Sequence, residues 1–144
     1  MLVSQILKSK GSDGVATIPP GTTVAKAAEI LSQKKIGALV ISKDGKTLAG
    51  IISERDIVRE LGRRGAACMT EAVESIMTSR VFTCVRADPT DELLQKMTIG
   101  RFRHIPVVEG GQLVGLISIG DVVKARLSEL SMEKDALEGM IKGF

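Results

Sequence analysis

The feature that most constrains the fold of this chain is an internal duplication. The segment Gly50–Val58 reads GIISERDIV, and Gly115–Val123 reads GLISIGDVV without gaps, 65 positions later. Both follow the order Gly, two aliphatic residues, Ser, two variable residues, Asp, two aliphatic residues. Upstream, Ala38–Ile41 aligns with Ile105–Val108 at an offset of 67, and the segments before them keep that offset. Self-similarity of this kind indicates one structural unit that occurs twice.

Turn residues and apolar periodicity predict the order of elements in each copy. The first copy is expected to contain a strand at 16–18, a helix from Thr22 or Thr23 to just before Gly37, strands at 38–41 and 48–52, and a helix from Ser53 to about Leu61. The second copy is expected to contain a strand at 82–85, a helix opened by Asp88 and Pro89 and closed near Gly100, strands at 105–108 and 113–117, and a helix from Ile119. Both copies therefore read β-α-β-β-α.

The predicted fold is a mixed α/β (α+β) fold of two β-α-β-β-α units with a C-terminal helical extension. A unit of about 60 residues buries only roughly 60% of its unfolded surface, which leaves it marginal alone, so the two halves are expected to pack together. The predicted boundaries are a first unit with its N-terminal segment at 1–68, a linker at 69–79, a second unit at 80–130 and a helical tail at 131–144.

The tail carries aliphatic residues at near-heptad spacing. These residues are Val123, Leu127, Leu130, Leu137 and Ile141. Ser131, Lys134 and Gly139 weaken the stripe. Two alternatives stay open, namely a helix that packs on its own domain and a helix that makes a dimer contact.

Composition excludes several classes of partner. The 144 residues include 44% hydrophobic residues, three Phe, and no Trp or Tyr, and the net charge is +3 with both signs interspersed. Such a chain has neither the basic stripe nor the stacking platforms that nucleic acids require. Its apolar runs are far shorter than the ~18 residues of a membrane span, and the N-terminus lacks a secretory signal. We expect a cytoplasmic protein without nucleic-acid or membrane partners.

The residue types that support catalysis are sparse. Cys68, Cys84 and the single His104 form no motif typical of a metal site, and the cysteines are expected to be reduced thiols. The chain has no P-loop and no acid pair suited to general acid and base work. We therefore expect no metal, no catalytic residues and no catalytic cofactor.

The repeated Ser-x-x-Asp motif has two possible roles. Ser53–Asp56 and Ser118–Asp121 are close to a capping-box pattern, which would stabilise a helix without any ligand. Alternatively, a strand that ends in such a turn presents N–H groups, a hydroxyl and a carboxylate, which together suit a ribose phosphate. Arg55 in the first copy, and Arg103 and His104 in the second, add cations near the same edge.

The duplication, the run RHIPVV at 103–108 and the two Gly-x-x-Ser-x-x-Asp endings resemble a tandem pair of cystathionine β-synthase (CBS) domains over roughly residues 3–130. This resemblance implies a stand-alone regulatory module of bacterial type, in which two units form a pseudo-two-fold pair. Two clefts of that pair would bind adenosyl ligands such as AMP, ADP, ATP, NAD(H) or S-adenosylmethionine. It further implies a homodimer and an unknown regulated protein.

The resemblance also implies roles for individual residues. Ser53 and Asp56 would contact phosphate and ribose in one cleft, and Ser118 and Asp121 would do so in the other, with Arg55 and Arg103 as nearby cations. The adenine pockets would be lined by Thr17, Ile18, Ile36, Gly37 and Ala38 in the first cleft, and by Thr83, Val85, His104, Ile105 and Pro106 in the second. Because the copies differ in these residues, we expect unequal sites.

The leading hypothesis is a non-catalytic adenine-nucleotide-binding regulatory module that senses energy or redox state. One alternative is a structural module for protein–protein contact with vacant clefts. The other alternative is a small nucleotide-processing enzyme, which the shortage of catalytic residues disfavours.

Overall fold

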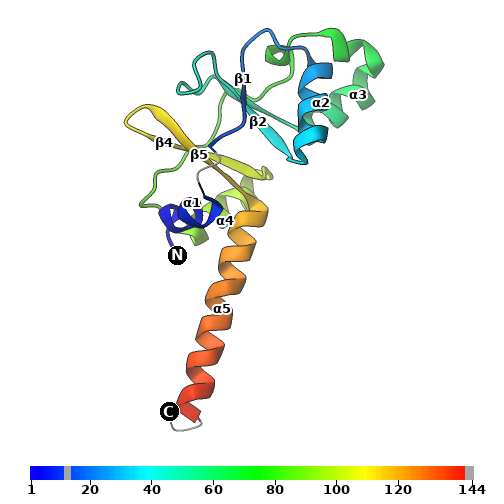
Figure 1. Ribbon diagram of the computed structural model, residues 1–144. Helices are drawn as coiled ribbons and strands as arrows, with labels where there is room; N and C mark the ends of the chain where they lie inside the picture. Colours follow the sequence, from blue (N-terminus) through cyan, green and yellow to red (C-terminus); the bar gives the residue numbers. More distant parts are fainter. Residues whose placement is uncertain (12–13, 142–144) are drawn as a thin grey trace. The chain divides into compact units, whose positions relative to one another are not determined.

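The computed structural model describes residues 1–11 and 14–141 and divides into two compact units (Figure 1). The first-repeat unit comprises Gly14–Phe82 and Val108–Val114. The second-repeat unit comprises Met1–Asp13, Thr83–Val107 and Gly115–Phe144. The predicted mixed helix and strand fold is confirmed. The boundaries predicted at 68, 79 and 130 stay predictions.

The first-repeat unit contains the complete β-α-β-β-α sequence of elements. These are β1 (Thr17–Ile18), α2 (Val24–Lys34), β2 (Ala38–Ile41), β3 (Gly50–Ser53) and α3 (Glu54–Arg64), followed by the short helices η1 (Gly65–Thr70) and η2 (Val73–Ser75). The sheet order is β1-β2-β3, with a parallel and then an antiparallel pairing. The predicted cap of α2 is confirmed, because the Thr23 hydroxyl accepts a hydrogen bond from Lys26 N at 3.1 Å.

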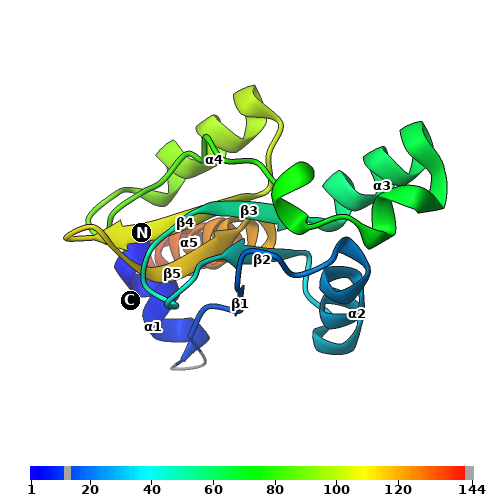
Figure 2. The same cartoon turned by 90° about the horizontal axis from the view of Figure 1, so that it is seen from above.

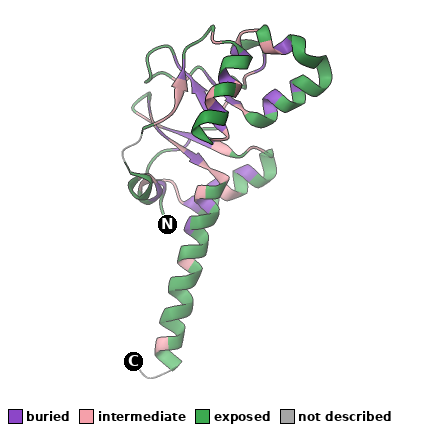
Figure 3. Cartoon of the chain, turned by 45° about the vertical axis from the view of Figure 1, so that its right-hand side comes forward, coloured by how far each residue is buried: buried purple, intermediate pink, exposed green. Residues whose placement is uncertain are grey.

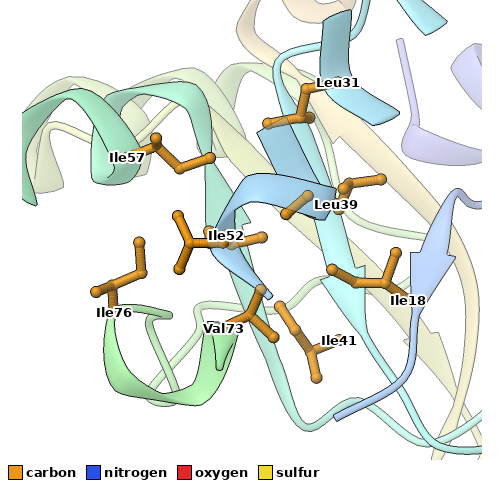
Figure 4. Packing of buried hydrophobic residues seen from close by; sticks show 10 residues of the cluster. Ile18, Leu31, Leu39, Ile41, Ile52, Ile57, Val73 and Ile76 are labelled. Atoms are coloured by element: carbon orange, nitrogen blue, oxygen red, sulfur yellow. The ribbon is translucent and has the colours of Figure 1, made fainter. Parts of the chain in front are cut away.

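An aliphatic cluster fills the space between this sheet and its helices (Figure 4). Leu39, Ile41 and Ile52 from β2 and β3 are fully buried, and they pack with Leu31 of α2 and Ile57 of α3. The cluster contains no aromatic residue, so short aliphatic side chains supply the close packing that an interior needs. This packing fixes the strand ends from which the repeated Ser-x-x-Asp motif projects.

Helix α3 continues beyond its predicted end at about Leu61. It passes through Gly62 and stops at Arg64, where Gly65 adopts a φ of 72°. The Glu60 carboxylate accepts hydrogen bonds from Arg63 Nη1 at 3.0 Å and Arg64 Nε at 2.9 Å, which stabilise the last turn. The hydrogen bond from Arg64 holds the pKa of Glu60 below its ordinary value.

The second repeat contains the corresponding elements, and its unit also contains an N-terminal helix. These elements are α1 (Val3–Lys10), α4 (Thr90–Gly100), β4 (His104–Glu109), β5 (Gln112–Ser118) and α5 (Ile119–Ile141). Strands β4 and β5 form a two-stranded sheet. Residues Val108–Val114, at the hairpin end of these two strands, belong to the first-repeat unit. Helix α5 lies between α4 and α1 when viewed along its axis and contacts both (Figure 2).

The strand predicted at 82–85 is reduced to one parallel bridge between Cys84 and Val107. In the first repeat, Val40 N donates to the Ala16 carbonyl oxygen at 3.1 Å, which extends the β1–β2 ladder. Pro106 occupies the equivalent position of the second repeat and has no N–H to donate. The ladder is therefore shorter in the second repeat.

The structural offset between the two copies is 66 across the first helix and the following strand. Helices α2 and α4 each have 11 residues, start 66 positions apart, and end in left-handed residues, Lys35 and Arg101. The offset of 67 inferred from sequence is thus wrong by one residue. His104 takes the first position of β4, which corresponds to Ala38 at the start of β2. The aliphatic run of the second copy therefore begins one residue later.

The repeat is also longer than the sequence reading found. Val3 and Ile6 of α1 correspond to Val73 and Ile76, 70 positions later, and all four are buried. Each of these two segments lies in the unit of the other repeat. Helix α1 precedes the first repeat in the chain but lies in the second-repeat unit, and residues 73–76 precede the second repeat but lie in the first-repeat unit. The signal in the sequence was the spacing Val-x-x-Ile, present in both places.

The repeated glycine of the motif is explained by that packing. A Cβ on Gly50 would lie 2.7 Å from Met77 Sδ and 2.9 Å from the Thr78 carbonyl oxygen. A Cβ on Gly115 would lie 2.5 Å from Leu7 Cδ2. Leu7 and Met77 are themselves 70 positions apart. Both copies therefore use glycine to let the preceding segment approach the strand closely.

Candidate functional site

The first copy of the motif forms a reciprocal capping box at the junction of β3 and α3. The Ser53 hydroxyl accepts from Asp56 N at 3.2 Å, and Asp56 Oδ2 accepts from Ser53 N at 2.9 Å. Ser53 Oγ also donates to Asp56 Oδ2 at 3.0 Å, while Arg59 Nη2 donates to Asp56 Oδ1 at 2.8 Å. Both carboxylate oxygens of Asp56 are therefore engaged by the protein. The helix-capping role predicted for the motif is confirmed in this copy.

The second copy repeats the reciprocal Ser–Asp hydrogen bonds but has a different cation. Asp121 N donates to Ser118 Oγ at 3.1 Å, and Ser118 N donates to Asp121 Oδ2 at 2.9 Å. Lys10 Nζ donates to Asp121 Oδ2 at 2.8 Å and to the Leu116 carbonyl oxygen at 2.8 Å. Lys10 Nζ and Ser118 N therefore both donate to the same carboxylate oxygen, Oδ2. Among the described residues, no hydrogen bond ends on Asp121 Oδ1.

Electrostatics keep the second carboxylate ionised. Burial raises the pKa of Asp121, but the hydrogen bond and charge of Lys10 and the Ser118 N–H lower it by more. The pKa of Asp121 therefore lies below its ordinary value. An ionised carboxylate is the stronger acceptor for sugar hydroxyls.

The residues expected around the first site fall on neighbouring strands. Ala38 pairs with Ser53 across β2 and β3, and Glu54 N donates to the Gly37 carbonyl oxygen at 3.0 Å, so this end of β2 lies beside the N-terminus of α3. Thr17 and Ile18 pair with Val40 and Ile41, further along the same strand. Ile36 is half-buried and Arg55 is exposed.

The residues expected around the second site are brought together less completely. Ile119 N donates to the Arg103 carbonyl oxygen at 2.8 Å, which repeats the contact at Gly37 and places Arg103 and His104 beside the start of α5. Ile105 and Pro106 are buried in β4. Thr83 is exposed, one residue before the Cys84 bridge. Val85 lies past that bridge, away from the His104 end, in a turn where its N–H donates to Asp88 Oδ2 at 2.9 Å.

Two cations at these motifs were missed by the sequence reading. Arg59 could have been found, because it follows Asp56 by three positions on a predicted helix. Lys10 lies 111 positions before Asp121, and no local pattern connects the two. Only the packing of α1 in the second-repeat unit brings Lys10 to this carboxylate.

Other kinds of site receive no support from the described residues. No group of three or more His, Cys, Asp or Glu side chains among them is arranged to hold a metal ion. Both cysteine thiols are buried. None of the described helices combines the length and hydropathy required of a membrane-spanning segment.

The fold and the motif define a class of protein, a duplicated β-α-β-β-α module whose two strand-to-helix junctions carry matching Ser-x-x-Asp boxes. The family model described as CBS domain matches residues 3–63 and 73–128. The chain belongs to the CBS domain family, as its sequence resemblance predicted.

Known proteins agree with this assignment. The CBS-domain containing protein ATU1752 from Agrobacterium tumefaciens has a TM-score of 0.83 and 44% identity, covering 88% of this chain and 99% of that one. The CBS domain protein PAE2072 from Pyrobaculum aerophilum, solved in complex with AMP, has a TM-score of 0.75 and 28% identity. This match covers 92% of this chain and 99% of that one. The mitochondrial protein CBSX3 from Arabidopsis thaliana is 35% identical, covering 98% of this chain and 72% of its own length. Several further curated relatives are about four times longer, since the chain spans 22–25% of them.

Proposed function

We propose that this chain is a non-catalytic regulatory module that binds an adenine nucleotide. The observation that carries the proposal is the pair of Ser-x-x-Asp boxes, each placed where a strand meets a helix N-terminus. Such a junction offers N–H groups and a helix dipole to a phosphate, and a carboxylate to ribose hydroxyls. AMP bound to PAE2072, a structural relative, supports an adenosyl ligand.

We infer that the second copy is the better ligand site. Asp56 has both carboxylate oxygens engaged by Ser53 and Arg59, so a ribose hydroxyl would have to share Oδ1 with Arg59. Asp121 keeps Oδ1 available to a ligand, and Lys10 Nζ has used two of its three protons. The sites are thus unequal, and the inequality comes from the cation beside each carboxylate.

We propose that the ligand is AMP, ADP, ATP, NAD(H) or S-adenosylmethionine. We also propose that the module senses energy or redox state, acts on a regulated protein that is unknown, and is located in the cytoplasm. Regulation would require the ligand to bind two conformations with unequal affinity. The proposed readout is contact with another protein chain.

A thermal-unfolding panel with each of these compounds tests the proposal. A ligand at 100 times its dissociation constant stabilises the folded state by ~2.7 kcal/mol, which corresponds to a rise in Tm of several degrees. Flat curves for every adenosyl compound would instead support a module for protein–protein contact with vacant clefts. Product analysis after long incubation separates binding from turnover, and any hydrolysis would support the enzyme alternative.

A further inference from the structure

Helix α5 carries an apolar stripe that its own unit does not cover. Its buried residues are Val122 and Ala125, on the face toward α4 and α1, and no described residue of α5 beyond Ala125 is buried (Figure 3). The outer stripe consists of Val123, Leu127, Leu130, Lys134, Leu137 and Ile141. Its five aliphatic side chains are 44% to 78% exposed.

The spacing of the α5 stripe is that of a two-helix seam. Its six residues follow one another at intervals of 4, 3, 4, 3 and 4, which is a heptad pattern of a and d positions. At about 100° per residue they lie within an arc of roughly 80°, on a different face from Val122 and Ala125. The helix therefore has one face for its own unit and a second face for another helix.

We propose that α5 pairs with α5 of a second copy of this chain as an antiparallel two-helix coiled coil. Lys134 is the one polar residue of the stripe, and it decides the direction. Parallel helices would place two Lys134 ammonium groups opposite each other in the seam. Antiparallel helices place each Lys134 opposite Leu130 of the partner subunit, where its aliphatic stem can pack and its charge can reach solvent.

The antiparallel register brings all six positions of the stripe together. Val123 then faces Ile141 of the partner subunit, Leu127 faces the partner's Leu137, and Leu130 faces the partner's Lys134. The seam spans about 27 Å at a rise of 1.5 Å per residue. No shorter overlap uses every residue of the stripe.

Charges beside the stripe favour the same direction. Lys124 flanks Val123 and Glu138 flanks Leu137, so the antiparallel register sets Lys124 beside Glu138 of the partner subunit at both ends of the pair. Lys124 has no ion pair among the described residues, and Glu138 has only a 3.9 Å contact to Lys134. Parallel helices would set Glu133 beside the partner's Glu138, which repels. In the antiparallel pair Glu133 lies near the symmetry axis, beside Glu133 of the partner subunit and within reach of the partner's Lys134, so a single Glu–Glu contact replaces two.

Full-length variants test whether the α5 stripe associates. Leu127→Glu with Leu137→Glu puts four carboxylates into the seam of a pair, because these two positions face each other in the antiparallel register. Met132→Glu with Ala136→Glu is the matched control, because it adds the same charges to exposed positions on the opposite face of α5. Sedimentation equilibrium should show the control associating like the wild type, and the stripe variant at least about 100-fold more weakly, as expected for unpaired buried charges. Circular dichroism checks that α5 stays helical.

Disulfide trapping tests the direction. Leu127→Cys and Leu137→Cys proteins should cross-link when mixed, and neither should cross-link alone, since two copies of position 127 lie about 15 Å apart along the axis. The oxidised wild type is the blank, because Cys68 and Cys84 are buried. Cross-linking of Leu127→Cys with itself would overturn the antiparallel assignment. A wild-type monomer at ~100 μM, far above a typical specific Kd, or a dimer that the stripe variant leaves intact, would overturn the proposal. Neither result depends on whether nucleotide binds.

Discussion

Replacement of Asp121 by Asn is the most direct perturbation of the proposed ligand site. The variant keeps the size of the side chain and an acceptor for Ser118 N, but it removes the charge that a ribose hydroxyl would meet at Oδ1. A hydrogen bond to a charged group contributes about 1.5–3 kcal/mol, so AMP should bind roughly 10-fold to 150-fold more weakly. Isothermal titration calorimetry at fixed salt measures this change.

The matched control is Asp56→Asn in the first copy. Both oxygens of Asp56 already accept hydrogen bonds from Ser53 and Arg59, so a ligand would gain less there, and the loss of its charge should change AMP affinity by less than about threefold. If Asp56→Asn abolished binding while Asp121→Asn left it unchanged, the ranking of the two sites from their hydrogen bonds would be refuted.

Unfolding of the unliganded variant separates a ligand role from a structural role. Asp121→Asn removes the ion pair with Lys10. In this pair the Lys10 side chain is 42% exposed and the Asp121 side chain is 22% exposed. Pairs of this exposure contribute about 0.2–1 kcal/mol, so Tm should fall by no more than about 2–4 °C. A much larger fall together with unchanged AMP affinity would favour helix capping as the sole role of Asp121.

Two further predictions concern stability. Gly50→Ala should destabilise the protein by about 1–3 kcal/mol in urea unfolding, because the new Cβ meets the Thr78 carbonyl oxygen. Thr78 cannot move away easily, since backbone hydrogen bonds hold it to Ile51. An unchanged urea midpoint would show that the segment around Thr78 shifts to make room. Acid should remove the contribution of Asp121 to the free energy of unfolding. Because the pKa of Asp121 is lowered in the folded state, this contribution is complete above the ordinary pKa of 3.8 and is lost as the pH falls through the folded-state pKa. The Tm difference between wild type and Asp121→Asn should therefore shrink below about pH 4, and a difference that grew there would contradict the lowered pKa.

Much of the local structure could be predicted because it depends on neighbours in the sequence. The strand at 38–41, the Thr23 cap and the Ser53 capping box follow from apolar runs and from side chains three positions away, and the structure contains all three. Errors arose where a single residue changed a boundary. Pro106 removed a ladder hydrogen bond, and Glu60 with its two arginines carried α3 past Gly62.

The sequence by itself determined the duplication, the β-α-β-β-α order of the first repeat and the two Ser-x-x-Asp boxes, since each is encoded by residues close together in the chain. Tertiary structure alone decided how the two boxes differ. Asp56 receives Arg59 from its own helix, whereas Asp121 receives Lys10 from a helix 111 positions away. The packing of Val3 and Ile6 in the second-repeat unit places that lysine, and buried contacts between distant segments leave no local pattern in a sequence.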